Sequence, residues 1–172
     1  MEKLLEKLAE YELLNNLLPG ALFCVLFEWH FHIHPQEYNA FVEILIFYSV
    51  GMIIGRFGSL IVEPMCKWRN FIQFADYSSY IKASEKDPTI KILSEKNNMY
   101  RSFASMFVLC LTLLVPELLL KWATTKFFPM QIFLEVIGAS LVGCLFFYSY
   151  KKQTDYIRNR ISTHIKETQG GN

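Results

Sequence analysis

Charged residues are scarce in this chain. Asp, Glu, Lys and Arg make up 19% of its 172 residues, against about 25% in an average soluble domain. The net charge of +1 excludes a nucleic-acid binder that acts through overall basicity. Hydrophobic residues account for 52% of the sequence, and the mean hydropathy is positive at +0.22. The deficit of charge falls in four long apolar runs, which argues against an ordinary soluble domain.

The motifs of common enzymes and metal sites are also lacking. The sequence contains no Gly-x-Ser-x-Gly, no His-Glu-x-x-His and no glycine-rich phosphate loop. The four cysteines lie in or beside the apolar runs and lack the paired spacing of a disulfide framework or a zinc site. We therefore expect reduced thiols, no catalytic residues, no bound metal and no cofactor.

Three histidines near the end of the first apolar run invite a metal interpretation. On a helix only His30 and His34 share a face, His32 does not, and no acidic or cysteine partner stands at ligand spacing. We expect these side chains to be solvated at the membrane edge. A pH-sensing role fits the same residues.

The four apolar runs predict an all-α polytopic membrane protein with four transmembrane helices. An α-helix needs about 20 apolar residues to cross a hydrocarbon core of roughly 30 Å. The predicted spans are residues 17–33, 41–62, 103–120 and 130–150. With their flanking segments they divide the chain into 1–16, 17–62, 63–102, 103–150 and 151–172.

Amphipathic segments are predicted on both sides of the spans. In residues 1–16 apolar side chains recur at three- and four-residue intervals, which indicates a helix lying in the membrane interface. Pro19 and Gly20 predict a break or kink after it. In the tail, residues 151–172, isoleucines at four-residue steps predict an amphipathic helix that extends into solvent; they are Ile157, Ile161 and Ile165.

Between the second and third spans, residues 63–102 predict a cytoplasmic helical hairpin. Asp87 and Pro88 have the pattern of an N-cap and a first helical position, so the hairpin is divided there. The basic and aromatic residues Lys67, Trp68 and Arg69 could offer charge and stacking surface to a phosphate-bearing ligand. Contact with lipid headgroups is the alternative, and juxtamembrane basic residues commonly make it.

The distribution of Lys and Arg predicts the topology. The N-terminal helix carries two, the hairpin seven and the tail five, whereas the connection after the first span has none and that after the third has two. Basic residues favour the cytoplasmic side. We expect both termini and the hairpin to be cytoplasmic, with the protein in the bacterial inner (plasma) membrane.

Five charged residues fall within or at the ends of the predicted spans. A charge that faces lipid costs at least about 2.5–3.5 kcal/mol near mid-membrane, so Glu28 and Arg56 should face protein or water. Glu28 and Arg56 can form an ion pair. Alternatively, the outer carboxylates attract cations to a pore that Arg56 guards on its inner side. The five residues are Glu28, Glu43, Arg56, Glu117 and Glu135.

Small residues on the second span predict close helix packing. Gly51 and Gly55 have the small-x-x-x-small spacing, and Ser59 continues the same face. Packing within one subunit and packing between subunits satisfy this spacing equally well.

The two ends of the chain resemble small four-span membrane proteins of bacterial anti-phage defence systems, the Hailong-type membrane effectors. The residues that carry the resemblance are Tyr11, Glu12, Leu17, Leu18, Pro19 and Gly20, and then Tyr148, Lys152, Gln153, Tyr156, Ile157, Arg158, Arg160 and Ile161. The resemblance implies a homo-oligomeric effector that a partner or a nucleotide-derived ligand holds closed. It also implies a cytoplasmic nucleotidyltransferase as a possible partner and depolarisation of the inner membrane during infection.

Two functional hypotheses follow. The first is a homo-oligomeric, ion-conducting pore in the inner membrane that a cytoplasmic ligand or partner gates. The second is a membrane-anchored scaffold subunit whose hairpin and tail recruit a cytoplasmic partner without conducting. A small transporter is a third possibility, but no internal repeat relates the two halves of the chain.

Overall fold

The computed structural model describes the backbone of residues 2–32, 39–125 and 128–170, and the side chains of residues 13–32, 39–125 and 128–165. The described part of the chain is all-helical and contains no strand. Its elements are α1 (Glu2–Phe31), α2 (Ala40–Phe57), the π-helical turn η1 (Gly58–Val62), α3 (Glu63–Trp68), α4 (Tyr77–Lys86), α5 (Thr89–Thr125) and α6 (Met130–Gly170).

Three helical segments of the described chain are long and apolar enough to cross a membrane. They are Ala40–Trp68, Thr89–Thr125 and Met130–Ile165, and between 11% and 28% of the residues in their most apolar stretches are buried. Apolar surface exposed on this scale needs lipid or further copies of the chain to cover it. The predicted spans 41–62, 103–120 and 130–150 lie within these segments. The predicted first span, 17–33, is not among them and stays a prediction.

Two helices continue through positions where the sequence predicted an end. Pro19 lies inside α1 and is buried, so the chain does not break between the N-terminal helix and residues 17–33. Likewise, the helix that begins at Ala40 runs past Glu63 and Pro64 to Trp68. There the Glu63 amide N–H bonds the Gly58 carbonyl, five residues earlier. This wider π turn lets the chain continue into α3, where Pro64 takes one of the first helical positions.

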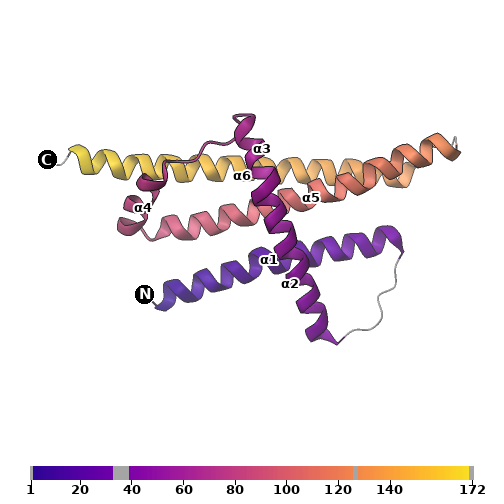
Figure 1. The fold of residues 1–172 in the computed structure, drawn as a ribbon, viewed down its shortest axis with the longest axis horizontal. Helices are drawn as coiled ribbons and strands as arrows, with labels where there is room; N and C mark the ends of the chain where they lie inside the picture. The colour runs from indigo at the N-terminus through magenta and orange to yellow at the C-terminus, as the bar shows by residue number, and fades with distance from the viewer. Residues whose placement is uncertain (1, 33–38, 126–127, 171–172) are drawn as a thin grey trace.

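In Figure 1, α1, α5 and α6 run roughly alongside one another, whereas α2, η1 and α3 cross them steeply. We call these three crossing elements the α2 arm. The arm meets α1 at two glycines: a Cβ atom added at Gly51 would lie 1.7 Å from the Asn16 carbonyl oxygen, and one at Gly20 would lie 1.8 Å from that of Phe47. The two backbones therefore touch, which only glycine permits.

The α4 end of the molecule has a core of its own. Ala83 of α4, Ile90 of α5 and Ile157 and Ile161 of α6 are buried together. We call α4 and the parts of α5 and α6 that pack on it the hairpin end. The predicted isoleucine stripe of the tail is therefore an interior contact at these two positions. Part of the stripe thus packs against α4 and α5, and the extension of the last helix into solvent stays a prediction.

The boundary predicted at Asp87 and Pro88 is confirmed. The Asp87 carboxylate accepts a hydrogen bond from the Thr89 amide at 3.1 Å, and α5 begins at Thr89.

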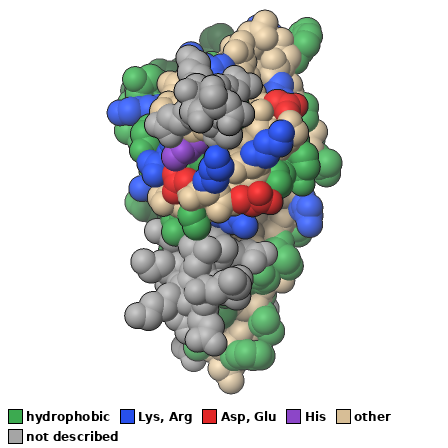
Figure 2. All heavy atoms as spheres, turned by 90° about the vertical axis from the view of Figure 1, so that its left-hand side faces the viewer, with side chains coloured by type: hydrophobic (Ala, Val, Ile, Leu, Met, Phe, Trp, Pro, Cys, Tyr) green, Lys and Arg blue, Asp and Glu red, His purple; other side chains and the backbone are tan. Residues whose placement is uncertain are grey.

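Chain termini and α4 lie at the same end of the molecule (Figure 1). Viewed from that end, basic and acidic side chains lie close together around α4 (Figure 2).

Candidate functional site

A connected group of polar side chains within the long helices is centred on His30. Its Nε2 atom lies 2.6 Å from Glu117 Oε2, and its Nδ1 atom lies 2.6 Å from Glu135 Oε2. Lys121 Nζ bonds the other oxygen of Glu117 at 2.7 Å, and Gln131 donates to Glu135 at 3.2 Å. The group joins α1, α5 and α6, and we call it the His30 cluster.

The sequence predicted Glu117 and Glu135 as separate outer carboxylates and His30 as a solvated group. The structure brings all three together and leaves 11% of the His30 side chain exposed. No local sequence pattern indicates this arrangement, because the three residues come from three different helices. His30 and Glu117, for example, are 87 positions apart in the sequence. Among the described residues no three or more His, Cys, Asp or Glu side chains could hold a metal. His34 lies outside the described residues.

Glu28 and Arg56 are not brought together. Within the described side chains, no ion pair or hydrogen bond joins them, so the ion-pair interpretation gains no support. The cause is the crossing: α1 and α2 touch at Asn16 and Gly51 and diverge from there. Glu28 lies nearer the C-terminal end of α1 than this contact, and Arg56 lies nearer the C-terminal end of α2. Glu28 and Glu43 are both half-buried. Glu43 lies in the first turn of α2, outside the His30 cluster.

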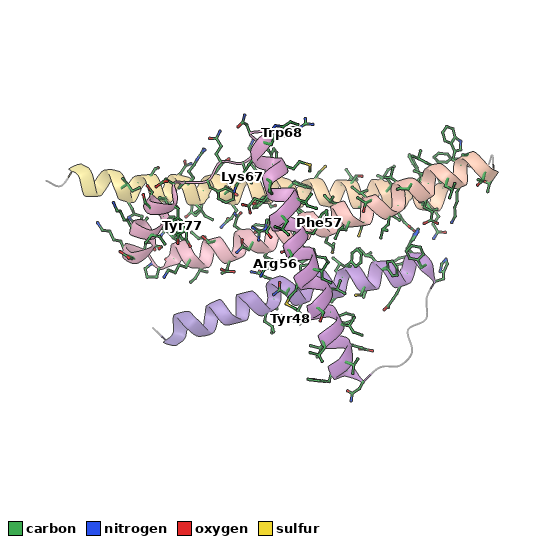
Figure 3. The ribbon with its side chains drawn as sticks, viewed as in Figure 1. Tyr48, Arg56, Phe57, Lys67, Trp68 and Tyr77 are labelled. Atoms are coloured by element: carbon green, nitrogen blue, oxygen red, sulfur yellow. The ribbon has the colours of Figure 1, made fainter. Side chains whose placement is uncertain are left out.

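Arg56 is exposed and shares its side of α2 with large exposed apolar residues (Figure 3). Ser49 is two turns before it on the same side. The exposed apolar neighbours on this stretch of the arm include Met52, Ile53 and Leu60, and Leu60 is 72% exposed. Within the described chain, the Arg56 guanidinium therefore sits on an apolar surface.

The glycine face of the arm packs within the chain. Gly51 contacts α1, and a Cβ atom at Gly55 would lie 3.7 Å from both the Asn16 and the Ser102 side chains. Gly58 continues the face, since a Cβ atom there would lie 2.6 Å from the Ser105 hydroxyl. The predicted third member, Ser59, instead bonds the Arg56 carbonyl of its own helix at 3.0 Å. The seam is therefore Gly51, Gly55 and Gly58, and it contacts α1 and α5.

A second ion cluster, which the sequence did not indicate, lies where the arm crosses α5. Glu63 accepts from Arg101 at 2.6 Å and from Lys67 at 2.7 Å. The π turn just before Glu63 sets the direction of its carboxylate, because one additional residue in a turn rotates every later side chain about the axis. Buried next to this cluster is Tyr150, in a core with Val62 and Cys66.

The proposed ligand-binding residues of the hairpin already have partners in the chain. Lys67 is paired with Glu63 and lies 4.6 Å from the centre of the Phe74 ring. The Arg69 guanidinium lies 5.2 Å from the Trp68 ring centre, and Trp68 is 77% exposed. The three residues are exposed and form an aromatic and basic end to the α2 arm, where Figure 3 shows Lys67 and Trp68. The structure tests neither a phosphate ligand nor lipid headgroups there.

Comparison with family models, with curated proteins and with solved structures finds no match to this chain. The resemblance to anti-phage effectors therefore stays a prediction. What can be argued about function depends on the geometry described above.

Proposed function

We propose that this chain is one subunit of a homo-oligomeric membrane effector that conducts ions, gated by a cytoplasmic ligand or partner during anti-phage defence. Arg56 is the observation that carries the proposal. A lone arginine that faces lipid near mid-membrane costs about 2.5–3.5 kcal/mol. Arg56 is exposed on the single chain, so a second copy or a water-filled path has to accommodate it.

The shape of the α2 arm supports an assembly of several copies. Apolar side chains are exposed along the arm, with Phe41 68% exposed near its start and Leu60 72% exposed within η1. The α2 contacts with its own chain centre on the glycine face. Several arms packed around one axis would cover this apolar surface and bring several Arg56 side chains together, which is how a ring of like charges arises in a pore.

Conductance through the full-length protein in planar bilayers tests the proposal. We expect current from the wild type, alone or with the products of its neighbouring genes. Arg56→Gln should change the reversal potential under a salt gradient, because it removes a positive charge from the path. Lys91→Gln is the matched control, since Lys91 is an exposed basic residue near the start of α5, away from the α2 arm. Protein that is oligomeric and folded yet never conducts would refute the pore.

A scaffold function is the second candidate, and the hairpin end favours it. That end has its own core and leaves Tyr77 76% exposed, a surface that a cytoplasmic partner could contact. Combined neutral replacement of Glu28 and Arg56 separates the two candidates. Unchanged protection against phage with intact folding favours the scaffold, whereas altered toxicity or conductance favours the pore.

A further inference from the structure

The His30 cluster contains one more hydrogen bond than a neutral imidazole can donate. A neutral imidazole has one N–H group and one nitrogen lone pair. Here both ring nitrogens lie 2.6 Å from carboxylate oxygens, one of Glu117 and one of Glu135. Ionised carboxylates only accept hydrogen bonds. Both contacts therefore require an additional proton, on the ring or on one carboxyl group.

The charges around the imidazole favour that proton. Glu117 and Glu135 supply two negative charges, and Lys121, which bonds Glu117 at 2.7 Å, supplies one positive charge. Gln131, which donates a hydrogen bond to Glu135, is neutral. The extra proton brings the sum to zero, and a neutral sum is favoured where the dielectric constant is low. Glu28, two residues before His30 on α1, forms no hydrogen bond or ion pair with the ring within the described side chains.

The surroundings of the cluster are mainly apolar. His30 and Glu135 lie at the edge of a cavity of about 390 Å³ between α1, α5 and α6. Its other walls are almost entirely apolar and include Phe27, Leu113 and Val142. The apolar walls offer no hydrogen-bond partner in place of the carboxylates, so the protonation state of the cluster affects how firmly the end of α1 is held to α5 and α6.

We propose that His30, Glu117 and Glu135 form a proton-binding site that fastens the end of α1 to α5 and α6 while the proton is bound. When the proton leaves, a nitrogen lone pair faces a carboxylate and the contact becomes repulsive. The end of α1 then separates, while the Gly20 and Gly51 crossing keeps the rest of α1 in place. The inference uses only these contacts and does not depend on ion conduction.

Nitrogen-15 NMR of the wild-type imidazoles in lipid nanodiscs tests the protonation directly. At pH 8 an ordinary histidine has lost its second proton, since its pKa is about 6.5. We expect one imidazole to keep the signature of a doubly protonated or strongly hydrogen-bonded ring, and its signal to be absent in His30→Gln. If all four histidines titrate together near pH 6.5, the proposal is wrong.

Amide hydrogen exchange at the C-terminal end of α1, corrected for the intrinsic effect of pH, tests whether the bound proton holds this end to α5 and α6. In the wild type, protection should fall by up to about tenfold per pH unit once the proton leaves, the limit for one proton. Glu135→Gln should stay protected at high pH, because its amide can donate to Nδ1 of a neutral ring. The matched control His32→Gln should behave as the wild type, since His32 is exposed.

Any of three results would refute the claim that the proton holds α1 in place. The first is wild-type protection that does not change from pH 5 to 9. The others are a Glu135→Gln variant that loses protection as the wild type does, and a His32→Gln variant whose protection does not depend on pH. The NMR measurement needs no variant to fold, because the wild type alone shows whether one imidazole differs from the others.

Discussion

The hairpin end and the Arg56 side of the α2 arm differ in how their polar groups are satisfied. At the hairpin end, buried Asn97 bonds Thr154 at 3.1 Å, and the Arg160 guanidinium bonds Asp87 at 2.6 Å. In the arm, Arg56 is exposed on an apolar helix. The hairpin end is thus largely complete within one chain, whereas the arm has a surface that something outside the chain has to cover.

The largest effect is expected where the arm touches α1. Gly51→Ala places a Cβ atom 1.7 Å from a backbone oxygen that cannot rotate away. Overpacking a well-packed interior costs about 1–3 kcal/mol or more, so we expect the arm to detach or the protein to fail to fold. Thermal unfolding in detergent measures this.

Gly138→Ala is the matched control for that experiment. A Cβ atom there would meet nothing within 4 Å, so the change should leave stability equal or slightly higher, because alanine favours a helix by about 1 kcal/mol over glycine. If both substitutions have the same effect, the arm is not held by this close contact, and the contrast between the two regions fails.

A smaller effect is expected from the buried amide at the hairpin end. Asn97→Ala leaves the Thr154 hydroxyl without its partner across α5 and α6. The hydroxyl can still donate to the Tyr150 carbonyl at 2.8 Å, so the expected loss is that of one net hydrogen bond, about 0.5–1.5 kcal/mol. The loss should appear as a lower melting temperature without a change in oligomeric state. Asn98→Ala, which removes a weak contact of 3.5 Å with Glu95, should change stability much less.

The smallest effect concerns the ion pair at the α4–α5 junction. The hydrogen bond from Arg160 lowers the pKa of Asp87 from 3.8 to about 2. A lowered carboxyl pKa stabilises the fold above pH 3.8, and this contribution is lost as the pH falls from about 4 to 2. Because the pair is partly open to solvent, we expect about 1 kcal/mol or less.

Asp87→Asn should remove that part of the acid dependence, measured as the melting temperature between pH 2 and 5. Asp155→Asn is the matched control, because Asp155 forms only a local pair with Arg158 at 3.4 Å. An equal loss of acid dependence in both variants would mean that Asp87 does not fasten α6 to the junction.

Sequence patterns predicted the structural features that depend on one continuous stretch of the chain. The length of the apolar runs located three helices that are long and apolar enough to cross a membrane, and a local cap motif at Asp87 located the start of α5 at Thr89. The crossing was not predictable, because the spacing of Gly51 and Gly55 does not say which helix they meet. His30 was misjudged for the same reason: its two carboxylate partners come from distant helices and leave no local pattern.

The steep crossing of the α2 arm also has a consequence for how the protein can sit in a bilayer. At 1.5 Å per residue, a helix of 29 residues such as Ala40–Trp68 is about 44 Å long. The hydrocarbon core is roughly 30 Å thick, so the arm still reaches both faces when inclined by about 45°. The 37-residue Thr89–Thr125 segment has still more excess length. The surplus length lets the arm and the α5–α6 pair lean in opposite directions, so that helices which cross one another steeply can each traverse the same membrane.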